Sequence, residues 1–252
     1  MKIATFNIDW AKKYKSEKTK AQKTFSKIED FLNKQDFDFL ILTEAIDLNL
    51  EKFPFRYFSE NIPEHIEYEE LNYSDYLNGE KAFRTAIYSK TKAVKKYDVA
   101  DRYTNLALEF ETEFGNVVFL ATIIGTWFSQ KPKYAKAELI NLIKDSKKII
   151  EQNKNLFIVG DLNTSFKLNE KKTQINKKIS ESITYLFEEL HLYNATQNIE
   201  ENVDHIIVPY FLSDKIIESN FFIKKDELSD HKGIFITLQK TSSNIPSANS
   251  RI

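Results

Sequence analysis

The sequence predicts an α/β protein in which layered β-sheets are flanked by helices. Short apolar runs typical of strands alternate with stretches whose apolar residues recur at helical spacing. A hairpin-type turn at Phe114-Gly115-Asn116 also joins two consecutive strand patterns directly. The combination of hairpins and strand–helix alternation favours mixed sheets covered by helices over an all-β or all-helical protein.

The N-terminal half of the chain begins with a strand pattern over residues 2–8. Ala21, Phe25, Ile28 and Leu32 then recur at helical spacing and predict a helix. Further strands are expected over residues 37–43, 83–89, 105–111 and 117–124. The run over 37–43 is continuously apolar, as in a strand buried on both faces. The acidic, Tyr-rich span 47–81 predicts loops with short elements.

The C-terminal half continues the alternation. A long helix is expected to begin near Pro132, because proline favours the first helical turn, and Leu139 and Ile143 lie on its apolar side. The remaining predicted elements are a strand at 156–159, a helix at 179–190 and strands at 203–208 and 234–238.

No internal repeat and no linker rich in Pro, Gly or Ser divides residues 1–238. We therefore expect one domain over residues 1–240, followed by a flexible, Ser/Asn-rich tail over residues 241–252.

The composition excludes several classes of protein. With 42% hydrophobic residues, 13% aromatic residues and a net charge of −1, the 252-residue chain can bury a core and is not a disordered chain. The absence of Cys excludes disulfides, thiolate zinc sites and cysteine nucleophiles, so any metal must bind oxygen or imidazole ligands. No leader pattern and no apolar run of roughly 18 residues is present, which predicts a soluble, cytoplasmic protein without a membrane segment.

Polar side chains follow nearly every predicted core strand. They are Asn7, Asp9, Glu44, Asp161, Asn163, Asp204, Asp230 and His231. Taken singly, each has an alternative interpretation as a turn, cap or structural residue. Glu44 is the hardest to explain in this way, because an unpaired charge at the end of a buried strand is unfavourable.

Several carboxylates converging on one site would repel one another unless a cation lay among them. Carboxylate and amide oxygens select hard cations such as Mg²⁺, Mn²⁺ or Ca²⁺. Together with an Asn amide and a Ser-Asp-His unit, such a site suits the hydrolysis of phosphate esters.

Five short motifs, in this order, resemble the endonuclease/exonuclease/phosphatase superfamily: TFNID, LILTEA, VGDLN, VDHIIV and SDHKGI. This superfamily includes DNase I and the exonuclease III type apurinic endonucleases. The resemblance covers about residues 2–238. It implies a DNase I-like four-layered α/β sandwich, with two packed mixed β-sheets flanked by helices, and a cleft at one end of the sheets.

The resemblance also implies roles for individual residues. Glu44 would be the principal metal ligand, with Asn7 and Asp230 nearby and Asp9 as in the apurinic endonuclease branch. Asp161 would position or deprotonate the attacking water, and Asn163 would orient that water or the scissile phosphate. His231, backed by Asp204, would hold or protonate a phosphate oxygen.

The sequence departs from the superfamily at the end of the strand over 117–124, where many members carry a second catalytic His or a Tyr. The chain reads ATIIGTW there. Three explanations remain open: a substitute donor from Thr122, Thr126 or Trp127, a Tyr or Lys from the span 47–81, or slow catalysis. Arg84 and Trp127 are candidates for substrate binding, as a phosphate contact and a stacking ring; a surface arginine and a core or rim aromatic are the alternatives.

The sequence thus predicts a phosphoesterase dependent on Mg²⁺ or Mn²⁺ that acts on DNA or RNA by metal-assisted, in-line attack of water. One alternative is a phosphatase or phosphodiesterase of a small phosphate ester or a phospholipid head group. The other is a catalytically impaired binding domain, motivated by the missing second His. The expected partner is nucleic acid or another phosphoester substrate.

Overall fold

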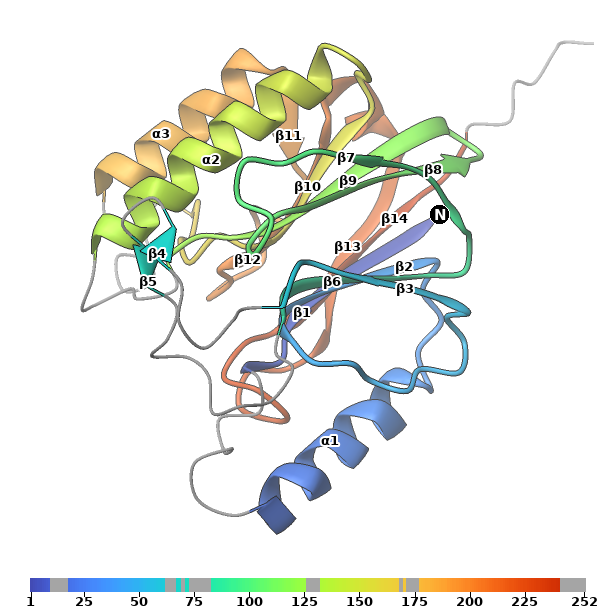
Figure 1. The fold of residues 1–252 in the computed structure, drawn as a ribbon. Helices are drawn as coiled ribbons and strands as arrows, with labels where there is room; N and C mark the ends of the chain where they lie inside the picture. Colours follow the sequence, from blue (N-terminus) through green and yellow to red (C-terminus); the bar gives the residue numbers. More distant parts are fainter. Residues whose placement is uncertain are drawn as a thin grey trace, which may run out of the picture.

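Two six-stranded β-sheets pack face to face between layers of helices (Figure 1). The structure, a computed structural model, describes residues 1–9, 18–61, 67–68, 71–72, 83–125, 132–167, 170 and 177–240. Helix α1 covers the outer face of the first sheet, and helices α2 and α3 cover the outer face of the second. The four-layered α/β sandwich implied by the sequence motifs is confirmed.

The first sheet has the strand order β13-β14-β1-β2-β6-β3. Its strands are β1 (Lys2–Asn7), β2 (Phe39–Ala45), β3 (Phe55–Phe58), β6 (Phe83–Ser89), β13 (Ile216–Ile223) and β14 (Gly233–Leu238). Strands β1 and β2 are parallel, and helix α1 (Lys18–Leu32) lies between them in sequence. All other pairs in this sheet are antiparallel.

The second sheet has the order β11-β12-β10-β9-β8-β7. Its strands are β7 (Ala93–Tyr97), β8 (Leu106–Thr112), β9 (Gly115–Ile123), β10 (Leu156–Asp161), β11 (Leu192–Asn194) and β12 (Asp204–Pro209). Strands β9 and β10 are parallel, with helix α2 (Pro132–Ile150) between them in sequence. The remaining elements are helix α3 (Lys177–Glu189), the 3₁₀ helix η4 (Tyr210–Lys215) and a pair of two-residue strands, β4 (Glu67–Tyr68) and β5 (Leu71–Asn72).

The main core lies between the two sheets and is rich in aromatic rings. The Phe39 ring lies 5.0 Å from that of Phe110 and 4.6 Å from that of Phe119, and Phe119 lies 5.3 Å from Phe157. The two contacts of Phe39 join one sheet to the other, because Phe39 belongs to β2 and its partners to β8 and β9. The contact between Phe119 and Phe157 lies within the second sheet, between β9 and β10. Burial of such rings is the largest favourable term holding the layers together.

Strands at the edges of the sheets were not expected from the sequence. Strands β7 and β13 are edge strands whose residues are mostly exposed, so they lack the apolar pattern of a buried strand. Strand β13 even exposes Ile217 and Phe221. By contrast, the strands and helices predicted outside the span 47–81 are present, with ends that differ by a few residues.

Among the described residues, no helix is both long and apolar enough to cross a membrane. The expected tail over residues 241–252 lies outside the described residues.

Candidate active site

Strands from both sheets bring polar residues to one end of the sandwich. Asn7 is the last residue of β1 and Asp161 the last of β10, while Asp204 opens the antiparallel strand β12. The pairing of β10 with β12 sets Asp161 directly opposite Asp204. His231 lies just before β14, which runs antiparallel to β1. These four residues, far apart in sequence, therefore meet where their strands begin or end.

A glycine permits the close approach of two strands just before Asp161. Gly160 has φ +141°, and a Cβ added there would lie 2.0 Å from the backbone oxygen of Thr122 on the neighbouring strand β9. No other residue type fits this position without moving the backbone. The glycine of the VGDLN motif is thus explained by the close approach of β9 and β10.

Three of the predicted site residues adopt left-handed backbone conformations: Asp9 with φ 53°, Glu44 with φ 46° and Asn163 with φ 49°. This conformation is uncommon for residues other than Gly and Asn and is concentrated at functional sites. The three positions lie within two residues of the ends of β1, β2 and β10.

The carboxylate of Asp161 is held by two asparagines. Asn7 donates from Nδ2 to Oδ2 at 2.9 Å, and Asn163 donates from Nδ2 to the same oxygen at 3.1 Å. The backbone N–H of Asn163 donates to Oδ1 at 2.8 Å. These bonds fix the orientation of the carboxylate.

The same bonds determine which way each amide points. Asn163 Nδ2 also donates to the backbone oxygen of Ile124 at 2.9 Å, so both of its partners are acceptors, and exchanging its oxygen and nitrogen would create repulsion. Asn7 accepts the backbone N–H of Asp9 on Oδ1 at 2.8 Å and donates from Nδ2. Asn163 therefore offers only an acceptor oxygen to a further ligand.

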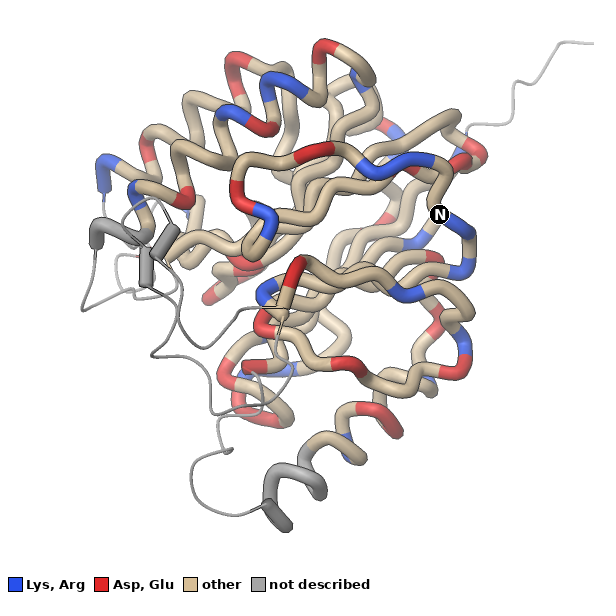
Figure 2. Tube along the Cα trace, in the orientation of Figure 1, with Lys and Arg blue, Asp and Glu red and all other residues tan. Residues whose placement is uncertain are grey.

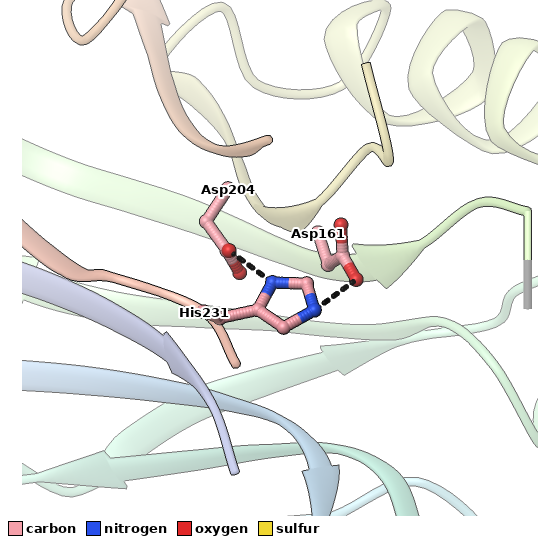
Figure 3. Close-up of side chains that lie close together, drawn as sticks. All are labelled: Asp161, Asp204 and His231. Atoms are coloured by element: carbon pink, nitrogen blue, oxygen red, sulfur yellow. Dashed lines mark hydrogen bonds and ion pairs between the residues drawn. The ribbon is translucent and has the colours of Figure 1, made fainter. Parts of the chain in front are cut away.

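His231 forms an ion pair with Asp204 (Figure 3). Its Nδ1 lies 2.7 Å from Oδ2 of Asp204, and its Nε2 lies 4.0 Å from Oδ2 of Asp161 and from Oδ1 of Asp230. Burial lowers the pKa of His231, but the charges of Asp204 and Asp161 outweigh it and raise the pKa to about 10. The ring is therefore a cation at neutral pH, with Nε2–H directed toward Asp161.

Two carboxyl groups at this end of the sheets have raised pKa values. Burial raises the pKa of Asp161 to about 7, against the opposing charge of His231. Burial also raises the pKa of Glu44 to about 8, and the charges of Asp9 and Asp161 add to this increase. Carboxylates that raise one another's pKa form a site that a cation would stabilise.

One group of described carboxylate and imidazole side chains lies close enough together to hold a metal. Ligand atoms of Asp161, Asp204 and His231 all lie within 4.8 Å of one another. In this trio, however, the His231 ring is already bonded to Asp204 and carries a proton, so a metal there would have to displace it. Glu44 lies outside this trio, and a carboxylate is a ligand that Mg²⁺ and Mn²⁺ prefer. Burial and the charges of Asp9 and Asp161 raise its pKa, while the charges of His231 and Arg84 lower it. Asp230, whose side chain is 45% exposed, lies beside His231.

The structure places Arg84 in the interior rather than on the surface. Its side chain is 0% exposed, and Nη2 lies 2.9 Å from Oε1 of Glu138, which is also fully buried. The side chain is therefore engaged with helix α2. Trp127, the other predicted substrate contact, lies outside the described residues.

The end of β9, where the sequence lacks His or Tyr, contributes backbone groups to the site. The Ile124 oxygen accepts from Asn163, as described above, and the Gly125 N–H donates to Oε2 of Glu138 at 2.6 Å. Thr122 instead donates its hydroxyl to Oδ1 of Asn105 at 2.7 Å. Sequence reasoning missed Glu138, because a glutamate in a helix carries no local signal that its side chain is buried.

A second histidine, His205, holds the loop that follows Asp161. It is buried, and Nε2 lies 2.8 Å from the backbone oxygen of Thr164. Burial lowers its pKa to about 4, so the ring is neutral and donates from Nε2 to that oxygen. His205 thus has a structural role, although it follows Asp204 directly in sequence.

Comparisons with known proteins identify the family and the fold. The chain matches the sequence model of the Endonuclease/Exonuclease/phosphatase family over residues 4–231. One similar solved structure is that of the 3′ phosphatase NExo from Neisseria, bound to a product DNA hairpin. Its TM-score is 0.66 at 14% sequence identity, and the match covers 95% of this chain and 100% of the Neisseria chain. An AP endonuclease from Archaeoglobus fulgidus has a TM-score of 0.65 at 16% identity, with the same coverage of both chains. No curated protein sequence matches the chain. At these identities the structural likeness establishes the fold.

Proposed function

Because this chain belongs to the endonuclease/exonuclease/phosphatase family, a family of hydrolases, we propose that it is a divalent-metal-dependent phosphoesterase that cleaves phosphodiester bonds of DNA or RNA. The observation that carries the proposal is the arrangement around Asp161. Two asparagines orient this carboxylate, and a histidine held by a second aspartate faces it.

Asp161 accepts a proton from the attacking water. Its pKa of about 7 lies near neutral pH, which suits a general base. Asn163 uses both amide N–H groups on protein acceptors, so its oxygen accepts a hydrogen bond from the water. A phosphate oxygen is itself an acceptor and would not pair with that oxygen. The structure thus favours water as the partner of Asn163.

His231 binds an oxygen of the scissile phosphate. The ring donates from Nδ1 to Asp204, which leaves the Nε2–H available to substrate. Because the pKa of His231 is about 10, the ring remains positively charged and offsets the charge that develops on the phosphate. Asp204 Oδ1 is buried and bonds to no described residue, so the charge of Asp204 acts mainly on the ring.

The proposed ligands of Mg²⁺ or Mn²⁺ are Glu44, Asn7, Asp9 and Asp230. They fit a cation because burial and neighbouring carboxylates raise the pKa of Glu44 to about 8, which an adjacent positive charge would reverse. When bound, the ion supplies a positive field that polarises the phosphate. Asn7 also anchors Asp161, so it links this site to the general base.

Nucleic acid is the proposed substrate. The Neisseria structure of the same fold holds a DNA hairpin, and the Archaeoglobus enzyme is an AP endonuclease, which supports this choice. Lysines and arginines are interspersed with acidic residues along the described chain and do not gather into one stripe (Figure 2). We therefore expect recognition to depend on the site itself more than on a long basic surface. Trp127 remains a proposed stacking contact for a base or sugar. Arg84 is buried against Glu138, so we propose that it acts on the site through this residue and not by direct contact with substrate.

The test is to measure whether the purified protein hydrolyses each of four substrates. They are supercoiled DNA, single-stranded RNA, a DNA oligonucleotide with a 3′ phosphate, and bis-p-nitrophenyl phosphate. Each is assayed with Mg²⁺, with Mn²⁺ and with EDTA. Release of inorganic phosphate alone would assign a phosphatase, and hydrolysis of the small ester alone would favour a small phosphoester substrate.

The matched variants are His231→Asn and His191→Asn. His191 is exposed and has φ 52°, a conformation that Asn tolerates, so its replacement should leave hydrolysis unchanged. His231→Asn should lower kcat by about 100-fold or more, since it removes a charged donor to the phosphate. Equal activity of the two variants would contradict the proposed site.

A further inference from the structure

One peptide group at the end of β9 is held from both sides. Its carbonyl, that of Ile124, accepts a hydrogen bond from Asn163 Nδ2 at 2.9 Å. Its N–H, that of Gly125, donates to Oε2 of Glu138 at 2.6 Å. Asn163 and Glu138 thus contact opposite ends of the same peptide group.

Glu138 is in turn held by Arg84. Oε1 of Glu138 lies 2.9 Å from Nη2 of Arg84, and both side chains are 0% exposed. Arg84 lies in β6 of the first sheet, whereas Glu138 lies in α2 on the outer side of the second. The ion pair therefore connects the first sheet to helix α2, which packs on the second sheet.

The network continues from Asn163 to the general base. The Asn163 amide donates to Ile124 and also to Oδ2 of Asp161, at 3.1 Å. A line of hydrogen bonds thus runs from the buried ion pair, through one peptide group and one side-chain amide, to the carboxylate that accepts the proton from water.

We propose that Arg84 and Glu138 are positioning residues, which orient Asn163 and Asp161 through the Ile124–Gly125 peptide. This inference rests on the proposed function, because the water oriented by Asn163 belongs to that reaction. The end of β9 here supplies a backbone carbonyl whose direction the ion pair controls.

The charge of Glu138 matters in addition to its shape. A carboxylate accepts a stronger hydrogen bond from a backbone N–H than a neutral group does. Such a bond polarises the whole peptide group and makes the carbonyl at its other end a better acceptor. Gly125 has φ 84°, which favours glycine, so the peptide needs an external partner to hold one orientation.

The experiment is a double-mutant cycle of Glu138→Gln with Asn163→Gly. Glutamine keeps the size of the side chain and removes the charge, and glycine keeps the positive φ of residue 163, which is 49°. Glu138→Gln alone should lower kcat by about 10- to 100-fold with little change in KM, because it misplaces the water and not the substrate. In the Asn163→Gly background the same change should lower kcat by less than about twofold, because the residue through which Glu138 acts is already absent.

Asp145→Asn is the matched control. Asp145 lies in the same helix and is buried, and it accepts hydrogen bonds from the backbone N–H of Ala100 and from Asn105, both at 2.8 Å. Its replacement removes a buried charge. Among the described residues, the hydrogen bonds of Asp145 reach β9 only through Asn105 and the side chain of Thr122, and none goes to the Ile124–Gly125 peptide. The value of kcat should therefore be nearly unchanged. The proposal would be overturned if the losses of kcat in Glu138→Gln and Asn163→Gly multiplied in the double variant. It would also be overturned if Asp145→Asn lowered kcat as much as Glu138→Gln does.

Two further measurements keep the test decisive if Glu138→Gln folds poorly or if the protein has no phosphoesterase activity. Arg84→Lys keeps both charges and should give a smaller loss of kcat that also disappears in the Asn163→Gly background. The side-chain amide resonances of Asn163, assigned by their absence in Asn163→Gly, should shift in Glu138→Gln and stay in place in Asp145→Asn. If the protein has no hydrolytic activity but shows this shift, the proposed function is contradicted and the connection between Glu138 and Asn163 is supported. Resonances that do not move would contradict the connection.

Discussion

Nε2 of His231 lies 4.0 Å from Oδ2 of Asp161. This distance is too long for a direct hydrogen bond, so each group can still bind a third partner. One group is a cation held by Asp204 and the other a carboxylate held by asparagines. The proposed donor to phosphate and the proposed acceptor for water therefore face each other from different sheets.

The pH dependence of hydrolysis should reflect these two groups. Activity should rise as Asp161 loses its proton near pH 7 and fall as His231 loses its proton near pH 10. Asp204→Asn removes a charge that raises the pKa of His231, so the alkaline limb of kcat/KM should move to lower pH. Asp214→Asn, at an exposed aspartate bonded to Lys215, is the control and should leave the profile unchanged. An alkaline limb that stays in place in Asp204→Asn would show that His231 does not act as a cation.

Replacing Glu44 should stabilise the metal-free protein. The pKa of this carboxyl is about 8 in the folded chain against 4.5 for the ordinary group, so its contribution to stability is complete below pH 4.5 and is lost as pH rises through about 8. Glu44→Gln should therefore raise the melting temperature measured in EDTA at pH 8.5, by roughly 2–4 °C for each kcal/mol gained.

The same variant should lose its response to divalent metal. Mg²⁺ or Mn²⁺ should raise the melting temperature of the unaltered protein, because a ligand that binds only the folded state stabilises it. Glu44→Gln should reduce this increase, whereas Glu51→Gln, at an exposed glutamate, should preserve it. An equal increase in both variants would place the metal elsewhere, with the trio of Asp161, Asp204 and His231 as the next candidate.

Asp161→Asn should separate catalysis from stability. The variant keeps the size of the side chain and removes the proposed general base, so kcat should fall by about 100-fold or more. It also removes a buried charge whose pKa is raised by burial, but it places an NH₂ group against an N–H donor of Asn7 or Asn163. The two effects oppose each other, so the melting temperature in EDTA should change by only a few degrees. Steady-state kinetics and thermal unfolding on the same preparation measure both effects. Retention of most of kcat would exclude Asp161 as the base.

Gly160→Ala should be far more destabilising than Gly115→Ala. A Cβ at residue 160 meets the Thr122 backbone oxygen at 2.0 Å, whereas one at residue 115 meets nothing closer than Asn155 Nδ2 at 3.7 Å. Both glycines have positive φ, so the difference measures the close approach of the two strands. We expect a loss of roughly 3 kcal/mol or more at residue 160 and about 1–2 kcal/mol at residue 115, measured by urea unfolding. Similar losses would mean that β9 and β10 can separate at this point.

Much of the fold could be predicted because buried strands and amphipathic helices carry local patterns. Strand β2, which is buried along nearly its whole length, and helix α3, with its buried Ile179, Ile183 and Leu186, both have patterns of this kind. Strands β7 and β13 could not be found in this way, because an exposed edge strand has no apolar face to reveal it. Their presence depends on the neighbouring strands that pair with them.

The sequence by itself determined the residue types available for chemistry and the strand ends at which they lie. An Asp or Asn that interrupts an apolar strand, as at Asn7 and Asp161, is visible in the chain because burial disfavours unpaired polar groups. Only the tertiary structure decided which of these groups touch. It paired His231 with Asp204 and aimed Asn163 at Asp161. It also buried Arg84 against Glu138, 54 residues away, where the sequence allowed a phosphate contact. Such pairings depend on how two sheets and a helix pack, and no local pattern records the distance between side chains that folding brings together.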